Sequence, residues 1–214
     1  MALIDLNRKE IHCKIVYYGP GRSGKTTNLF YIYNAVSEKY RGKLLTIETR
    51  GERTLFFDLL PINLGQIHGL NIRLQLYTVP GQSHYRATRK LVLKGVDGIV
   101  FVADSLRKRR EKNIESLLDL KNNLRDYGLD LAQIPLVFQY NKRDLVTANV
   151  PLLTIEELQE DLNKELQVPY FEAAAAKGIG VFETLKEISK RTVKFVARKY
   201  VFSSEKVRAQ GGVI

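Results

Sequence analysis

The amino-acid sequence predicts an α/β fold in which a mostly parallel central sheet is flanked by helices. Short apolar, β-rich runs alternate along the chain with segments of helical periodicity. The run Gly98–Asp104 is almost continuously apolar, as expected for a strand that is buried on both faces. A glycine-rich pattern between the first predicted strand and helix has the form of a phosphate-binding loop. Together these observations predict the P-loop NTPase class.

The first half of the chain alternates strands with one long helix. Strands are predicted over Ile11–Tyr18, Lys43–Ile47, Thr54–Leu60 and Ile72–Val79, the last because apolar and polar residues alternate along it. A helix is predicted over Thr26–Tyr40, where apolar residues from Leu29 to Tyr40 recur at helical spacing. His84–Lys94 is predicted to be a short helix or an ordered loop.

The second half repeats the alternation. Strands are predicted over Gly98–Asp104, Ile134–Tyr140 and Tyr170–Ala173, and helices over Glu111–Tyr127, from Thr154 to about Leu166, and over Val181–Tyr200. Gly128 suits the cap after the first of these helices, because glycine adopts the left-handed conformation there easily. Thr154 and Glu157 have the spacing of a capping box.

Length and composition indicate one medium domain. The 214 residues divide into a domain over 1–200 and a C-terminal tail over 201–214 without clear periodicity, expected to be flexible or an adaptor. The single cysteine, Cys13, excludes an internal disulfide, and no Cys/His cluster offers a zinc site. No apolar run is long enough to span a membrane and the start of the chain has no signal-peptide stretch, so we expect a cytoplasmic location.

The balance of charge is strongly basic. Lys and Arg number 34 against 23 Asp and Glu, which gives a formal net charge of +11. Such a balance favours polyanionic partners: phosphates, an anionic membrane surface or nucleic acid. It does not choose among them.

The phosphate loop is the most specific motif in the sequence. It reads Gly19-Pro20-Gly21-Arg22-Ser23-Gly24-Lys25-Thr26, with Thr27 following in the helix. Gly19, Gly21 and Gly24 permit backbone angles that turn successive N–H groups inward at a helix N-terminus, which makes a nest for an anion. Lys25 places a cation against the β and γ phosphates, and the Thr26 hydroxyl can bind Mg²⁺. The alternative is a glycine-rich turn that occurs by chance.

A second motif indicates which base accompanies the phosphates. Asn141-Lys142-Arg143-Asp144 directly follows a predicted buried strand. The Asp144 carboxylate can accept hydrogen bonds from N1–H and the 2-amino group of guanine, a donor pair that adenine lacks. Asn141 can bridge to the phosphate loop, and the stem of Lys142 can cover the face of the base. The alternative is a loop with mixed charges.

With Pro80-Gly81-Gln82, these motifs make the chain resemble the Ras-like small GTPases over about Ile11 to Tyr200. The resemblance implies a Ras-like G domain that binds GTP and GDP with Mg²⁺. The segment EAAAAKGIGV lies where that family has a Ser-Ala-Lys motif, and aligning it on the Gly180-Val181 pair makes Ala175 the residue whose N–H would meet guanine O6. The Ser and Lys of the usual motif are absent.

A closer resemblance is to the MglA-type bacterial small GTPases, which set cell polarity and gliding motility. It is carried by the stretches KIVYYGPGRSGKTTNL, RTLFFDLLP, LYTVPGQ, LVLKGVDGIVFVADS and QYNKRDL. The sequence TVPGQ departs from the Ras pattern D-x-x-G in the same way as MglA does. The resemblance implies a regulator of the roadblock fold (MglB), effectors that bind the GTP form, and a strand before the Pro-Gly-Gln loop that shifts register on activation, for which Leu55–Leu60 is the candidate.

The resemblance also assigns roles around the γ-phosphate. Gln82 would orient the attacking water and Gly81 would offer its N–H to the γ-phosphate. Thr54 would bind Mg²⁺ when GTP is present, and Thr78 stands where Ras-like proteins have an aspartate that contacts Mg²⁺ through water. Arg53 would act as an arginine finger in cis, although a solvated loop arginine explains it equally well from sequence alone.

Two segments carry much of the excess positive charge. Lys186, Lys190, Lys194 and Arg198 follow one another at four-residue spacing in the last predicted helix, opposite its apolar face. They could meet an anionic membrane, such as the inner face of the cytoplasmic membrane or a cell pole, or simply be a solvated helix face. The run Arg107–Lys112 could join the same surface or bind an acidic partner. Nucleic acid is disfavoured because no recognition motif or stacking-aromatic pattern is present.

Three functions compete on these grounds. The first is an active GTPase switch, with Lys25, Gln82 and Arg53 as its catalytic groups. A nucleotide kinase is disfavoured by the guanine motif and the Pro-Gly-Gln loop. A nucleotide-binding scaffold with negligible hydrolysis remains open, because Thr78 is neutral and the Ser-Ala-Lys side chains are missing.

Overall fold

The computed structural model describes residues 3–5, 8–48, 56–67, 69–82, 85–148 and 150–210. Its strands are β1 (Leu3–Asp5), β2 (Glu10–Tyr18), β3 (Leu45–Glu48), β4 (Phe56–Ile67), β5 (Leu70–Thr78), β6 (Gly98–Asp104), β7 (Leu136–Asn141) and β8 (Tyr170–Glu172). Its α-helices are α1 (Lys25–Ala35), α2 (Arg86–Leu93), α3 (Arg110–Arg125), α4 (Ile155–Leu162) and α5 (Val181–Gln210).

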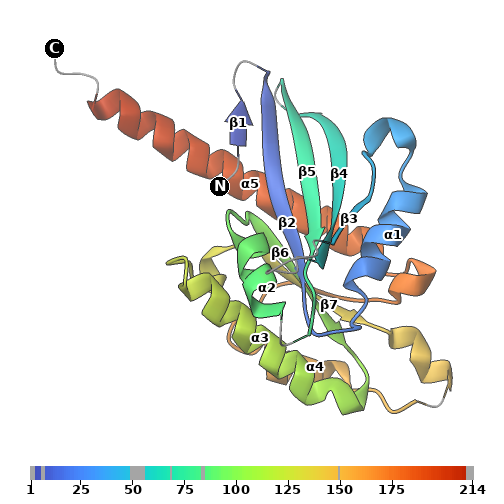
Figure 1. The fold of residues 1–214 in the computed structure, drawn as a ribbon. Helices are drawn as coiled ribbons and strands as arrows, with labels where there is room; N and C mark the ends of the chain where they lie inside the picture. The colour runs from blue at the N-terminus through green and yellow to red at the C-terminus, as the bar shows by residue number, and fades with distance from the viewer. Residues whose placement is uncertain are drawn as a thin grey trace.

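The strands form one eight-stranded, mostly parallel sheet, which confirms the predicted α/β class (Figure 1). The order is β3-β4-β5-β2-β6-β7-β8, with β1 paired to β2. From β5 to β8 all neighbouring strands are parallel, whereas β1, β3 and β4 enter as antiparallel partners. The parallel part is the part that carries the phosphate loop and the guanine motif at its carboxyl edge.

Each face of the sheet has its own core because successive side chains of a strand point to opposite faces. Val16 and Tyr18 of β2 pack on the side of α2, α3 and α4. Ile15 and Tyr17 of the same strand pack on the side of α1 and α5. Strand β6 is buried along its whole length, as its apolar sequence predicts.

The first helix is shorter than predicted. It ends at Ala35 because Val36 takes extended angles (φ −83°, ψ 130°), and a separate 3-10 turn, η1 (Glu38–Tyr40), follows. The predicted helix over Thr26–Tyr40 was therefore wrong at its C-terminal end. Tyr40 does not continue the apolar stripe, since 46% of it is exposed.

Strand β4 is longer than the predicted Thr54–Leu60. Pro61 and Gly65 lie inside it, and both residue types predict an interruption from sequence. The chain accommodates Gly65 as a bulge: its φ is +84° and the register against β5 shifts between Asn63 and Gly65.

The last two helices, α4 and α5, also differ in length from the predicted ones. Helix α4 begins with the predicted capping box of Thr154 and Glu157 but ends at Leu162, since the side chain of Asn163 binds the backbone of Val168 through both its oxygen and its nitrogen. Helix α5 continues past Tyr200 to Gln210, crossing behind the sheet and extending beyond it (Figure 1). The predicted boundary between domain and tail thus does not coincide with a helix end, and a separate tail stays a prediction.

Candidate functional site

The phosphate loop connects the end of β2 to the start of α1, as predicted. Gly19 and Gly24 need to be glycine because their φ angles are +139° and +103° and a Cβ would lie 2.2 Å from the carbonyl oxygen of Val102 or 2.1 Å from Asn141 Nδ2. Gly21 has no such need, since the nearest atom to its Cβ would be 3.6 Å away. The left-handed residue in the middle of the loop is Arg22, with φ +66°. The expectation that Gly21 supplies an unusual backbone angle was therefore wrong in this conformation.

Lys25 lies at the bottom of the loop, and 6% of it is exposed. Its ammonium donates to the carbonyl oxygens of Gly19 (2.9 Å) and Pro20 (2.6 Å). Burial, and after it the positive charges of Arg89 and Arg109, lower the pKa of Lys25 to about 7. A cation held among like charges is a strong site for a polyanion, because phosphate oxygens relieve both the desolvation and the repulsion.

Thr26 and Thr27 lie in the first turn of α1 and line the same cavity as Lys25. The Thr26 hydroxyl donates to the Oδ2 atom of Asp58 at 2.8 Å. Asp58 comes from β4 and is almost fully buried. It also accepts hydrogen bonds from the hydroxyls of Thr46 (3.0 Å) and Thr78 (2.8 Å).

Asp58 thus places a carboxylate beside Thr26, although position 78 carries a neutral threonine. Hydroxyl and carboxylate oxygens together with phosphate oxygens are the ligands that Mg²⁺ prefers. Thr26 and Asp58 therefore fit this ion, with Thr78 behind Asp58 as its hydrogen-bond partner. Among the described residues there is no group of three or more His, Cys, Asp or Glu side chains that could hold a metal by themselves, so phosphate would have to complete the site.

The Pro80-Gly81-Gln82 segment lies against the phosphate loop. Gly21 N–H donates to the Gly81 carbonyl at 3.1 Å, and a Cβ on Gly81 would come within 2.1 Å of the Gly21 nitrogen. Gln82 is exposed and lines the cavity next to Lys25. The structure therefore brings Gln82 to the phosphate end, where the resemblance places it. Arg53 and Thr54 lie outside the described residues.

A buried arginine holds this segment in place. Arg89 of α2 donates to the carbonyl oxygens of Pro80 (3.2 Å) and Gln82, and its Nε donates to Asp119 of α3 at 2.8 Å. The carboxylate of Asp119 also accepts hydrogen bonds from Tyr18 and Asn123. Arg89 therefore fixes the backbone around Gln82 to α3.

The guanine motif follows β7 and is joined to the phosphate loop. Asn141 Nδ2 donates to the carbonyl of Ser23 at 2.7 Å, the predicted bridge. Asn141 Oδ1 accepts the N–H of Ala175 at 2.8 Å. In this conformation the Ala175 N–H is thus bonded within the protein, and its role toward guanine stays a prediction.

The charged side chains of the guanine motif have defined partners. Lys142 has a left-handed backbone (φ 71°) and its ammonium donates to the buried carboxylate of Asp104 at 2.6 Å. Asp144 lies 3.6 Å from the ammonium of Lys177, a partly exposed residue. Lys177 follows Ala176, the position where the usual motif has its lysine, so it supplies a cation one residue later than expected.

The phosphate loop, the Pro80–Gln82 segment, α2 and α3 enclose one cavity of about 1170 Å³. Its walls include Lys25, Thr26, Gln82, Arg89 and Arg109. A cavity of this size with converging cations suits a polyphosphate group.

Comparison with known proteins agrees with this geometry. The chain matches the sequence profile of the ADP-ribosylation factor family over residues 1–192. It is 54% identical over 190 residues to the mutual gliding-motility protein MglA of Myxococcus xanthus (strain DK1622), which covers 89% of this chain and 95% of that protein. The chain belongs to the Ras-like small GTPases, in their MglA type. The GTPase is also 28% identical over 177 residues to Ras-related protein SEC4 of Saccharomyces cerevisiae (83% of this chain, 73% of that protein) and 25% identical over 188 residues to Ras-related protein Rab-7b of Bos taurus (87% and 84%). Family membership makes the GTPase a GTP-binding protein of the switch type.

Three residues of the site escaped sequence reasoning: Asp58, Arg89 and Arg109. Asp58 had a detectable signal, because it is the only charged residue in the apolar run Leu55–Leu60. A buried charge in a strand usually has a partner or a ligand. Arg89 and Arg109 had no such signal, since each stands among other basic residues.

The two basic segments do not form one surface, so that part of the expectation was wrong. The start of α3 packs on the opposite face of the sheet from α5. On α5, Lys186, Lys190, Lys194 and Arg198 are all exposed, as predicted, while Ile188 and Val196 are buried. Within the described residues no helix combines the length and the apolar character needed to cross a membrane.

Proposed function

We propose that this GTPase is a molecular switch that binds GTP with Mg²⁺, hydrolyses it to GDP, and regulates cell polarity or motility by binding effectors in its GTP form. The observation that carries the proposal is the convergence of Lys25, Thr26 and Gln82 on one cavity, together with the hydrogen bond from Asn141 of the guanine motif to Ser23 of the phosphate loop. The relative with 54% identity is named for gliding motility, which supports the cellular role.

The reaction is in-line attack of water on the γ-phosphate. Gln82, held by the Arg89 contact to its backbone carbonyl, orients the water. Lys25 and the N–H groups of the phosphate loop take up the charge that develops on the phosphate oxygens. Mg²⁺ bound at Thr26 and Asp58 would neutralise charge on the β and γ phosphates. By the family resemblance, Arg53 would complete the site as an arginine finger.

Partner-stimulated phosphate release tests the hydrolysis. We expect slow release of phosphate by the protein alone and faster release with an MglB-like roadblock-domain regulator. Preference for GTP over ATP in the same assay separates the switch from a nucleotide kinase. Tight GTP binding without phosphate release, with or without the regulator, would establish the alternative, a nucleotide-binding scaffold.

Two substitutions test the catalytic roles. Gln82→Leu should leave GTP binding intact and remove most turnover, and unchanged turnover would refute the role of Gln82. Arg53→Ala should lose the stimulation by the regulator while binding it normally. Full stimulated hydrolysis in that variant would remove the arginine-finger role.

The exposed basic face of α5 is proposed to hold the GTPase at an anionic membrane surface. Its cations lie on the face of the helix opposite the core, at about 1 kcal/mol of attraction per charge close to anionic lipid. Co-sedimentation with vesicles containing phosphatidylglycerol tests this. We expect binding that Lys190→Glu and Lys194→Glu together abolish and that Lys108→Glu, on the opposite face of the molecule, leaves unchanged. Binding without dependence on anionic lipid would reject the membrane role.

A further inference from the structure

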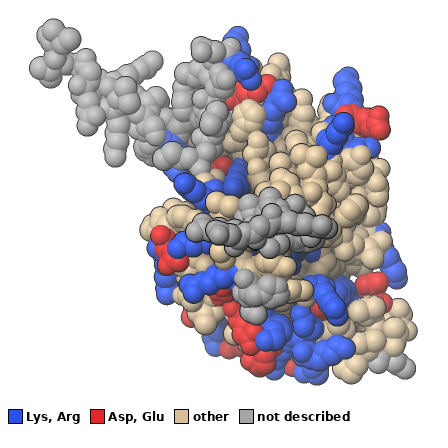
Figure 2. All heavy atoms as spheres, in the orientation of Figure 1, with Lys and Arg blue, Asp and Glu red and all other residues tan. Residues whose placement is uncertain are grey.

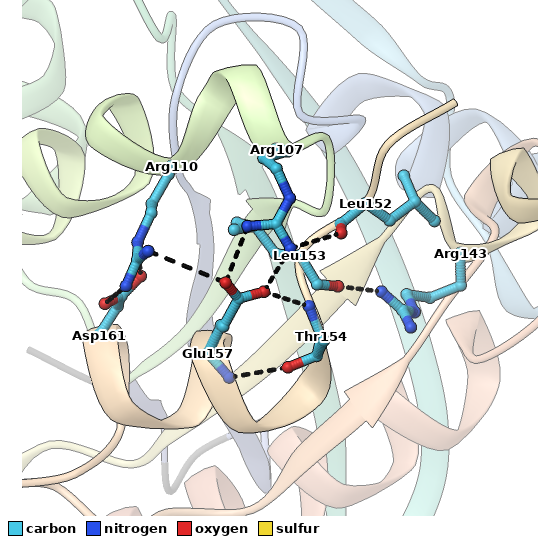
Figure 3. Close-up of polar contacts among 8 residues, drawn as sticks. All are labelled: Arg107, Arg110, Arg143, Leu152, Leu153, Thr154, Glu157 and Asp161. Atoms are coloured by element: carbon cyan, nitrogen blue, oxygen red, sulfur yellow. Dashed lines mark hydrogen bonds and ion pairs between the residues drawn. The ribbon is translucent and has the colours of Figure 1, made fainter. Parts of the chain in front are cut away.

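The proposed mechanism gives no role to the basic run Arg107–Lys112, although its three leading arginine contacts, from Arg107, Arg109 and Arg110, are all made to the protein itself. The run forms a 3-10 turn, η3 (Arg107–Arg109), and the start of α3. Arg107 makes two hydrogen bonds of 2.8 Å to the carboxylate of Glu157. Arg110 makes two of 2.8 Å to Asp161 (Figure 3). Figure 2 shows the same pairing on the surface: in the lower part of the view, where α3 and α4 lie, acidic and basic residues adjoin one another.

These contacts hold η3 firmly against α4. The hydrogen bond from Arg107 is the main reason that the pKa of Glu157 is lowered to about 2. Arg107 also reaches the carbonyl of Leu152, and Arg143 reaches that of Leu153 (Figure 3). The residues on both sides of Arg109 are therefore paired with acidic residues of α4, and these ion pairs form a frame around Arg109.

Arg109 itself turns the other way, toward the phosphate loop. Its Nη2 atom donates to the carbonyl oxygen of Gly21 at 2.6 Å. Its Nε atom lies 3.8 Å from the buried carboxylate of Asp104, which also binds Lys142 of the guanine motif. Arg109 lines the cavity that holds Lys25 and Gln82.

We propose that Arg109 is a positioning residue for GTP, acting through the peptide between Gly21 and Arg22. The carbonyl of Gly21 and the N–H of Arg22 belong to one planar trans peptide, so they point to opposite sides. The hydrogen bond from Arg109 to the Gly21 carbonyl therefore fixes the orientation of this peptide, and with it the direction of the Arg22 N–H in the loop that would bind phosphate. The inference rests on the proposed function, because it assumes that GTP occupies this loop.

The conformation of Arg22 explains why such an anchor is needed. Its φ of +66° is unfavourable for a residue with a side chain. Without the hydrogen bond from Arg109, the peptide would be free to rotate, and the direction of the Arg22 N–H would no longer be fixed. Loss of one aligned donor affects the transition state most, since negative charge builds up on the phosphates there.

The positive charge of Arg109 acts at the same place. It is among the charges that lower the pKa of Lys25, so its field reaches the bottom of the phosphate loop. Gly21 lies beside Gly81 and Gln82. The positive charge of Arg109 and the Arg22 N–H would therefore act on the γ-phosphate of a bound nucleotide rather than on its base. GTP should therefore depend on Arg109 more than GDP does.

Three variants of the full-length chain test the inference: Arg109→Ala, Arg109→Lys and the control Lys108→Ala. Lys108 is an exposed neighbour in η3, and its replacement removes the same charge without touching the loop. The measurements are fluorescent mant-GTP and mant-GDP affinities, the single-turnover hydrolysis rate, and the midpoint of thermal unfolding.

We expect Arg109→Ala to lower the hydrolysis rate about tenfold or more and to weaken mant-GTP binding more than mant-GDP binding. Arg109→Lys should recover part of the rate, because an ammonium can donate to the same carbonyl. Lys108→Ala should behave as wild type.

Two results would overturn the inference alone. The first is a rate for Arg109→Ala within twofold of that for Lys108→Ala. The second is an equal loss of mant-GTP and mant-GDP affinity together with a lowered unfolding midpoint, which would make Arg109 part of the frame only. Wild-type protein that binds no mant-GTP would overturn the proposed function and this inference with it.

Discussion

Replacing Arg89 by methionine should destabilise the protein by about 3 kcal/mol, because breaking a buried ion pair leaves its partner uncompensated. The Arg89 side chain is 7% exposed and donates to Asp119 at 2.8 Å, to the carbonyl of Pro80 at 3.2 Å and to that of Gln82. Removing one partner of a buried pair costs about 3–5 kcal/mol. The lower end applies here, since 25% of the Asp119 side chain is exposed and can recover hydration.

Urea denaturation measures this loss of unfolding free energy directly. In a separate thermal unfolding experiment, the midpoint temperature should fall by roughly 6–12 °C for a chain of this size. A double-mutant cycle with Asp119→Asn isolates the pair, and we expect a coupling of about 0.5–3 kcal/mol. Arg86→Met, on the same helix but exposed, is the matched control and should change stability by less than about 0.5 kcal/mol. A loss below about 1 kcal/mol for Arg89→Met, or simple additivity in the cycle, would refute the reasoning.

Three further predictions concern the metal site, the charge of the phosphate loop and the packing of α5. Asp58→Asn should raise the Mg²⁺ concentration for half-maximal hydrolysis about tenfold, since it removes the carboxylate beside Thr26; an unchanged Mg²⁺ titration would contradict this. GTP affinity should fall by up to about tenfold per pH unit as the pH rises from 7 to 9. The reason is that Lys25 loses its proton above about pH 7 in the free protein, and phosphate binding must restore that proton. A pH-independent mant-GTP affinity would count against the lowered pKa of Lys25. Gly98→Ala should cost about 1–3 kcal/mol in urea denaturation, because its Cβ would lie 2.1 Å from the Thr192 hydroxyl of α5. Adding Thr192→Ala should restore most of the loss, and a double variant no more stable than Gly98→Ala would contradict this.

The elements that the sequence predicts well are those with a local cause. The phosphate loop is contiguous, and the burial of β6 is visible in the six apolar or small residues that precede Asp104. The capping box at Thr154 likewise needs only residues that lie three apart. In each case the signal lies in residues that are neighbours in the chain, even where the contacts themselves are made to distant segments.

The elements that the sequence does not predict depend on distant partners. Asp58 and Thr26 are 32 residues apart, and Arg109 and Gly21 are 88 apart. A pattern of residue types contains no information on such pairs, so Arg109 could be assigned only to a surface cluster. The end of α4 is a similar case, since the contact of Asn163 with Val168 stops a helix that periodicity would continue.

The two hydrogen bonds of the Asn141 side chain have a kinetic consequence. One amide group fastens the loop under the phosphates through Ser23 and the loop beside the base through Ala175. Neither the Ser23 loop nor the Ala175 loop can move away while the Asn141 amide keeps both hydrogen bonds. Movement of the loop at the phosphate end would therefore weaken the hydrogen bond at the base end, and the reverse. We therefore expect the base and the phosphates of a bound nucleotide to be released together and not one after the other. A partner that pulls on either loop alone would speed the departure of the whole molecule.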